Sequence, residues 1–130
     1  MEIYKYQKVL IIDDSEMDLL VNQTILRTIK FAREIVTRNT GKEAIAYLME
    51  TIADPNDTLP DFILLDINMP IMNGFEFLEK FETIMEAENK CKIAVITSSE
   101  DLEDIQKVSS FKSVAGYLVK PLDIDSLNRF

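Results

Sequence analysis

The segment Phe62-Ile63-Leu64-Leu65-Asp66 decides the fold, because four apolar residues in a row are followed at once by a carboxylate. A continuous apolar run of this length is typical of a strand that is buried on both faces of a parallel sheet. The run Val9-Leu10-Ile11-Ile12 has the same character and ends at Asp13-Asp14. The two runs together predict buried parallel strands whose ends carry acidic side chains.

Two further apolar runs follow, with a polar residue at the end of each. Ile93–Ile96 ends at Thr97, and Tyr117–Val119 ends at Lys120, while Ile35–Thr37 is a weaker fifth strand. Segments with apolar residues at helical spacing lie between these runs. Five alternating strand–helix units predict an α/β fold, a doubly wound five-stranded parallel sheet with helices on both faces.

The predicted helices have recognisable beginnings and apolar stripes. Ser15-x-x-Asp18 and Thr40-x-x-Glu43 are typical of capped first turns, and a last helix begins near Asp123. On the first helix, we expect the buried face to carry Met17, Leu20, Val21, Thr24, Ile25 and Ile29. On the second helix, the corresponding stripe is Ala44, Ile45, Leu48, Met49 and Ile52.

Composition narrows the function classes. The 130 residues suit one domain and carry 14 basic against 23 acidic side chains, a net charge of −9. The chain has no histidine and only one cysteine, Cys91, which excludes disulfide frameworks, histidine metal sites and histidine bases. The acidic balance disfavours nucleic acid, and neither a signal peptide nor a membrane span is visible. We therefore expect a single domain over residues 1–130, located in the cytoplasm.

Carboxylate, hydroxyl and ammonium side chains follow the strands at one edge of the predicted sheet. In doubly wound sheets the ligand site lies beyond the carboxyl ends of the strands, here at Asp13, Asp14, Asp66, Thr97 and Lys120. Converging carboxylates repel one another, and Mg²⁺ relieves that repulsion because it prefers oxygen ligands. A carboxylate-held cation opposite a lysine and a hydroxyl suits a phosphoryl group, and a carboxylate can itself be the nucleophile.

The chain resembles the receiver domains of two-component response regulators, over nearly its whole length. The resemblance is carried by Lys8–Asp14, Gly41–Ala44, Ile63–Gly74, Ile93–Ser98 and Gly116–Pro121. These segments occur in the family's order and spacing. The resemblance implies the flavodoxin-like (βα)5 receiver fold, with strand order 2-1-3-4-5.

The resemblance also implies a role for each acidic residue. Asp66 would be the phospho-accepting aspartate, and Asp14 would be a direct ligand of Mg²⁺. Asp13 would place a water bound to the metal, and the backbone carbonyl of Asn68 would be a further ligand. The implied metal set is therefore Asp13, Asp14, Asp66 and Asn68, with Mg²⁺ as the cofactor.

The remaining implied roles concern phosphate binding and switching. Thr97 and Lys120 would each bind a phosphoryl oxygen, and the Lys120-Pro121 peptide bond would be cis. As Thr97 moves towards the phosphoryl group, the ring of Tyr117 would turn into the vacated space and change a protein-binding surface. The face that carries Tyr117 is also where receivers often form homodimers.

The expected function is that of a phospho-accepting receiver in a two-component or phosphorelay pathway. A sensor histidine kinase or a histidine phosphotransfer protein would donate the phosphoryl group, since this chain has no histidine. The target protein is not indicated by the sequence. The chain would not be a turnover enzyme, because it would catalyse only its own Mg²⁺-dependent phosphorylation and dephosphorylation.

Three alternative functions agree less well with the sequence. A degenerate receiver would act as a constitutive binding module, but the full set of strand-end residues disfavours it. A haloacid-dehalogenase-like phosphatase would need a second acidic residue where this chain has Asn68, and a flavin-binding domain would need a glycine-rich loop where it has Asp13–Glu16. The long segment Thr51–Pro60 is interpreted as a surface insertion. The last predicted helix is short, so either the chain ends early or a longer chain carries an effector domain.

Overall fold

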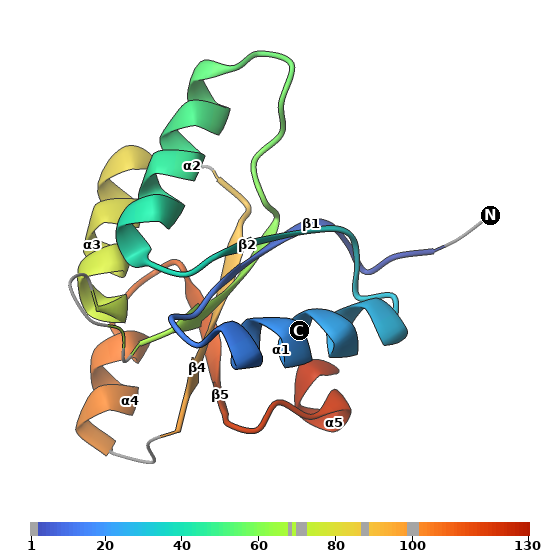
Figure 1. Cartoon of the computed structure of the whole chain (residues 1–130). Coiled ribbons are helices and arrows are strands. Elements are labelled where there is room, and N and C mark those ends of the chain that lie inside the picture. The colour runs from blue at the N-terminus through green and yellow to red at the C-terminus, as the bar shows by residue number, and fades with distance from the viewer. Residues whose placement is uncertain (1–2, 68, 70–72, 87–88, 99–101) are drawn as a thin grey trace.

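Five parallel strands form one sheet in the order β2-β1-β3-β4-β5 in the computed structural model of the chain (Figure 1). The structure describes residues 3–67, 69, 73–86, 89–98 and 102–130. The strands are β1 Tyr6–Ile12, β2 Ala32–Arg38, β3 Phe62–Asp66, β4 Lys92–Thr97 and β5 Val114–Val119. The helices are α1 Glu16–Thr28, α2 Gly41–Ala53, α3 Gly74–Ile84, α4 Leu102–Ser109 and α5 Ile124–Leu127. The predicted fold class and strand order are confirmed.

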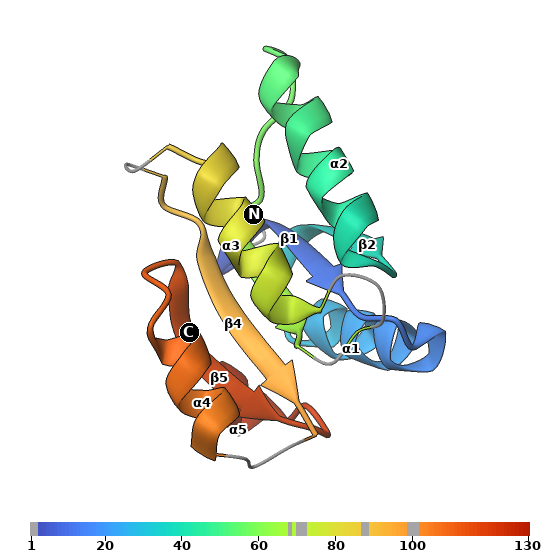
Figure 2. The same ribbon diagram turned by 90° about the vertical axis from the view of Figure 1, so that its left-hand side faces the viewer.

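Helices cover both faces of the sheet. Figure 2 shows α2, α3 and α4 in front of the sheet, with α1 and α5 behind it. Of the helices in the described part of the chain, none combines the length and the apolar character that a membrane crossing would need. The two helical layers explain why the central strands β1, β3 and β4 are largely apolar on both sides, whereas the edge strand β2 has exposed residues.

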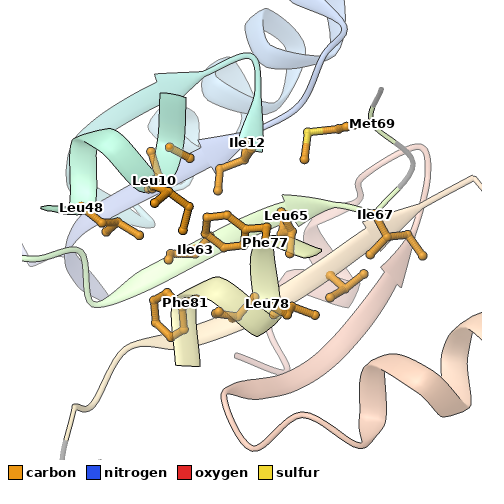
Figure 3. Packing of buried hydrophobic residues seen from close by; sticks show 14 of the residues in the cluster. Leu10, Ile12, Leu48, Ile63, Leu65, Ile67, Met69, Phe77, Leu78 and Phe81 are labelled. Atoms are coloured by element: carbon orange, nitrogen blue, oxygen red, sulfur yellow. The ribbon is translucent and has the colours of Figure 1, made fainter. Parts of the chain in front are cut away.

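Two apolar clusters fill the space between the sheet and its helical layers. On one side Leu10, Ile63 and Leu65 pack against Leu48 of α2 and Phe77 of α3 (Figure 3). The alternate residues of the same strands point to the other side, where they pack against Leu26 and Leu127 of α1 and α5. These strand residues are Val9, Ile11, Phe62 and Leu64. Asp66 thus ends a strand that is fixed by packing on both faces.

The predicted caps are confirmed, but the predicted buried face of α1 is correct only for Ile25 and Ile29, which are partly buried against the core. The Oγ atom of Ser15 accepts a hydrogen bond from the amide of Asp18 at 3.2 Å. Met17 and Leu20 are 75% and 64% exposed, whereas Asn22 and Leu26 are the buried residues of the helix. The helix carries apolar residues on more than one side, and packing selects the side that includes the polar Asn22.

The stripe predicted for α2 is correct in its first half only. Ala44, Ile45 and Leu48 are buried, but Met49 and Ile52 near the end of the helix are exposed. The Oγ1 atom of Thr40 accepts from the amide of Glu43 at 3.0 Å, as the cap motif predicts. In the last turn of α2 it is the polar Thr51 that is buried.

The segment between α2 and β3 is tied to the sheet by a buried lysine. Nζ of Lys8 in β1 donates to Oδ1 of Asp57 at 3.0 Å and to the carbonyl of Thr58 at 2.7 Å. The carboxylate of Asp61 accepts hydrogen bonds from the amides of Gln7 and Lys8, both at 2.9 Å. This surface insertion is thus anchored at the amino-terminal end of the sheet, remote from the strand ends that carry the predicted site.

Candidate functional site

The parallel register brings the strand ends to one edge of the sheet. Ile12 pairs with Leu65, so Asp13 and Asp14 emerge beside Asp66, the last residue of β3. On the other side of β3, Asp66 pairs with Ile96, which directly precedes Thr97. The predicted convergence of these side chains follows from the hydrogen-bonded ladder alone.

Three carboxylates form a cluster at this edge. Oxygens of Asp13, Asp14 and Asp66 all lie within 4.8 Å of one another. Asp13 is 1% and Asp66 is 4% exposed, while Asp14 lies open to solvent. The cluster thus combines two buried acids with an exposed one, Asp14, beside which a cation or a phosphoryl donor can approach.

The two oxygens of Asp13 have different surroundings. Oδ1 accepts a hydrogen bond from the amide of Ser15 at 2.9 Å, which orients the carboxylate. Oδ2 is buried and, within the described residues, accepts no hydrogen bond of good geometry, although Nζ of Lys120 lies 3.0 Å away. A buried carboxylate oxygen with spare acceptor capacity, in an all-oxygen donor set, fits a hard divalent cation such as Mg²⁺.

Lys120 is the cation of the site, and it faces three carboxylates. Its Nζ lies 2.8 Å from Oδ2 of Asp18, 3.0 Å from Oδ2 of Asp13 and 3.5 Å from Oδ2 of Asp66. Burial lowers the pKa of Lys120, but the hydrogen bond with Asp18 and the nearby charges of Asp13 and Asp66 outweigh it, so the pKa is raised. The ammonium therefore stays charged at neutral pH.

The backbone on either side of Lys120 fixes its position. Its amide donates to the carbonyl of Thr97 at 2.8 Å, which joins the end of β5 to the end of β4. The peptide bond between Lys120 and Pro121 is cis, as predicted. Thr97 itself is buried at the end of β4, next to the strand that carries Asp66.

Tyr117 and Asn68 are the other two residues that the sequence predicts for the site. Tyr117 lies in β5, is half-buried, and packs against the cluster between the sheet and α2, α3 and α4. The carbonyl of Tyr117 accepts a hydrogen bond from Nη2 of Arg129 at 3.0 Å. Asn68, the predicted carbonyl ligand, lies outside the described residues.

One residue of the site was not predicted from the sequence. Asp18 lies in the first turn of α1 and makes the shortest of the three carboxylate contacts with Lys120. The cap motif Ser15-x-x-Asp18 was the available signal, because it sets Asp18 in the first turn of a helix that begins directly after Asp13 and Asp14. Asp18 lies on a helix, whereas the carboxylates, hydroxyl and ammonium predicted for the site lie at strand ends.

Comparison with known proteins gives the same family as the geometry. Residues 9–129 match the family model of the response regulator receiver domain. The chain is 28% identical to response regulator Rcp1 of Synechocystis over 120 residues, which cover 92% of this chain and 80% of Rcp1.

Solved structures agree with this match. A two-component response regulator from Cytophaga hutchinsonii superposes with a TM-score of 0.87 at 34% identity, covering 95% of this chain and 92% of that one. The Mn²⁺-bound form of Rcp1 gives a TM-score of 0.74 at 27% identity, covering 95% and 87% of the two chains. The phosphorylated cyanobacterial phytochrome response regulator RcpA gives 0.76 at 28% identity, with the same coverage.

The family match spans almost the whole chain, and the strand order, the carboxylate cluster and the lysine at the end of β5 all agree with it. The chain therefore belongs to the response regulator receiver domain family and has the receiver role of two-component signalling.

Proposed function

We propose that the chain accepts a phosphoryl group on Asp66, in a reaction that requires Mg²⁺, and that this event switches a protein-binding surface. The observation that carries the proposal is the position of Asp66. Its carboxylate is buried at the end of β3, within 4.8 Å of the oxygens of Asp13 and Asp14, with Nζ of Lys120 at 3.5 Å. A nucleophile, a cation site and a fixed ammonium thus meet at one point.

Asp13, Asp14 and Asp66 would hold the cation, and Asn68 would add its carbonyl. When bound, Mg²⁺ would offset the negative charge of the carboxylates and of the incoming phosphoryl oxygens. The chain's own residues do the rest. A carboxylate oxygen of Asp66 attacks the phosphorus, and the new P–O bond forms as the bond to the donor nitrogen breaks. The electron pair of that bond leaves with the imidazole, which takes up a proton.

Lys120 and Thr97 would stabilise the transferred group. The ammonium of Lys120 already faces Asp66 and would pair with a phosphoryl oxygen, and the hydroxyl of Thr97 would donate to another. Attack of water on the aspartyl phosphate would release inorganic phosphate and restore the carboxylate. The protein would therefore promote only its own phosphorylation and dephosphorylation, and would not turn over a separate substrate.

The partners follow from the chemistry and the surface. Since the chain has no histidine, a sensor histidine kinase or a histidine phosphotransfer protein of the cytoplasm would supply the phosphoryl group. The exposed Met17, Leu20 and Val21 support protein docking near the site, because they lie on the helix that carries Asp18. The phosphorylated RcpA structure supports a phosphorylated state for this fold.

Thr97 and Tyr117 would couple phosphorylation to a change in the protein-binding surface. A hydroxyl drawn towards the phosphoryl group would leave room beside β4 for the ring of Tyr117, which is half-buried against the core. That movement would reshape the face formed by α4, β5 and α5, to which an effector protein or a second copy of the chain binds. The downstream target is a protein whose affinity depends on this face.

The test is phosphorylation by a small donor, which removes the need for the natural kinase. The chain is incubated with acetyl phosphate and Mg²⁺, and its intact mass is measured over time. We expect one phosphoryl group on the wild type, none in the presence of EDTA and none on Asp66→Asn. Asp125→Asn, which removes an exposed carboxylate of α5, should be labelled like the wild type. Full labelling of the Asp66→Asn variant would exclude Asp66 as the acceptor.

A further inference from the structure

We propose that Asp18 is a positioning residue of this site: its carboxylate holds the ammonium of Lys120 on the α1 side of the cluster and keeps it from settling between Asp13 and Asp66. The inference rests on the proposed function, which it deepens by adding a residue to the machinery. Asp18 is not among the strand-end residues, and its effect on the reaction would be exerted through Lys120.

The geometry gives Asp18 the strongest hold on the lysine. Its Oδ2 lies 2.8 Å from Nζ of Lys120, compared with 3.0 Å for Asp13 and 3.5 Å for Asp66. An ammonium has three N–H donors, and three carboxylates surround this one. Of the three distances from Nζ, the one to the nucleophile Asp66 is the longest and the one to Asp18 is the shortest.

Asp18 also lies outside the cation site. Among the described residues, the acidic group with ligand atoms close enough to share one cation consists of Asp13, Asp14 and Asp66. When a cation binds there, it competes with Lys120 for the oxygens of Asp13 and Asp66. The carboxylate of Asp18 remains a partner for Lys120 in that state, so the lysine has a fixed place while the cation enters.

Local structure holds Asp18 in this position. Its backbone amide donates to Oγ of Ser15 at 3.2 Å, and the amide of Ser15 donates to Oδ1 of Asp13 at 2.9 Å. The first turn of α1 is thereby tied to the cluster itself. The hydrogen bond with Asp18 also raises the pKa of Lys120 against the effect of burial.

Removal of this carboxylate would change the position of the lysine. With Asp13 and Asp66 as its remaining partners, the ammonium would move towards their oxygens, because opposite charges attract strongly where water is excluded. It would then occupy space that the cation needs and cover the nucleophile. Asp18→Asn should thus weaken cation binding and slow phosphoryl transfer.

The first measurement uses Mg²⁺ alone. The melting temperature is followed as Mg²⁺ is added, which gives the concentration for half-saturation. We expect Asp18→Asn to raise that concentration about five-fold, the size of effect typical of a partly exposed ion pair. Asp18→Glu should recover most of the affinity. Glu16→Gln removes the same charge from the same helical turn, at an exposed position, and should bind Mg²⁺ like the wild type.

The second measurement separates the role of Asp18 from a simple effect of charge. In the Lys120→Met background, Asp18→Asn should change Mg²⁺ affinity by less than about twofold, because the lysine through which it acts is gone. An equally large effect in both backgrounds would overturn the proposal, since the charge of Asp18 would then act on the cation directly. Wild-type affinity in the single Asp18→Asn variant would overturn it as well.

The third measurement is the rate of labelling by acetyl phosphate at saturating Mg²⁺. We expect Asp18→Asn to be slower by about five-fold, and Glu16→Gln to be unchanged. Failure to label the wild type would refute the proposed function, while the Mg²⁺ titrations would still decide the role of Asp18. If the wild type and Asp18→Asn are labelled at equal rates, the role of Asp18 is refuted while the proposed function stands.

Discussion

The backbone of Gly74 packs directly against that of Ile67. A Cβ atom at Gly74 would lie 2.4 Å from Cα of Ile67, and the amide of Gly74 donates to the carbonyl of Ile67 at 3.0 Å. Ile67 directly follows Asp66, so the start of α3 closes against the end of β3 within hydrogen-bonding distance. The position of the nucleophile thus depends on a contact that only glycine permits.

Gly74→Ala should therefore damage both stability and phosphoryl acceptance. Backbone atoms must move to admit the methyl group, and we expect a loss of about 1–3 kcal/mol in the free energy of unfolding, measured by urea denaturation. Labelling by acetyl phosphate should be slower, because the end of β3 shifts. In Gly116→Ala the new methyl meets the ring of Phe130 at 3.0 Å, a side chain that can turn away. Equal stability of the two variants would contradict this reasoning.

The buried ammonium of Lys8 depends on an exposed partner. Nζ of Lys8 lies 3.0 Å from Oδ1 of Asp57, and the pKa of Asp57 is lowered by the hydrogen bond from Lys8 and by a second one from the amide of Thr58. In Asp57→Ala the lysine would keep its charge in a buried position with fewer partners, which is costly. We expect Asp57→Ala to lower the melting temperature more than Asp125→Ala, another exposed acid.

The double variant tests this reasoning. Lys8→Met alone should cost about 1 kcal/mol, since it loses the hydrogen bonds but leaves no buried charge. The combination of Lys8→Met with Asp57→Ala should be more stable than Asp57→Ala alone, because the second substitution removes the uncompensated ammonium. Thermal unfolding of the four proteins measures the coupling, and simple addition of the two losses would refute the pairing.

Cys91 should react slowly with alkylating agents below about pH 10. Burial, with a smaller contribution from the charge of Asp61, raises the pKa of the Cys91 thiol to about 12. The pKa of the thiol in the unfolded chain is about 8.5, so above that pH the folded state keeps a proton that the unfolded state loses. Stability should therefore fall as pH rises from about 8.5 towards 12, and fall less in Cys91→Ala.

The iodoacetamide reaction measures this directly. The rate of reaction with the folded protein should rise only well above about pH 10, whereas the rate with the protein unfolded in urea should rise at about pH 8.5. A folded-state profile that follows the profile in urea would show that the thiol is not shielded. Unfolding measured by urea at several pH values, for the wild type and Cys91→Ala, checks the stability difference independently.

The strands and their ends could be predicted from the sequence because burial on two faces leaves an unmistakable pattern. Phe62–Leu65 has no polar residue, and Asp66 marks the point where the strand leaves the core. The same holds for Val9–Ile12 with Asp13. Parallel pairing then requires the ends to meet, so the cluster of carboxylates needed no knowledge of side-chain positions.

The helices were less predictable, because their apolar residues do more than cover the sheet. On α1, Met17 and Leu20 are exposed while Asn22 is buried, so the hydrophobic pattern was correct only for the partly buried Ile25 and Ile29. The role of Asp18 was invisible for a related reason. A carboxylate in the first turn of a helix is ordinarily explained by the helix dipole, and only the structure shows Lys120 within 2.8 Å of it.

The measurement that tests the central claim most directly is the chemical identification of the phosphorylated residue. The wild type is labelled with acetyl phosphate and Mg²⁺, reduced with borohydride, which converts an aspartyl phosphate to homoserine, and digested for peptide mass spectrometry. Homoserine should be found at position 66, only in samples that contained both reagents, and not at Asp13 or Asp14. Homoserine at another aspartate, or labelling that persists without Mg²⁺, would contradict the assignment of Asp66 as the metal-dependent acceptor.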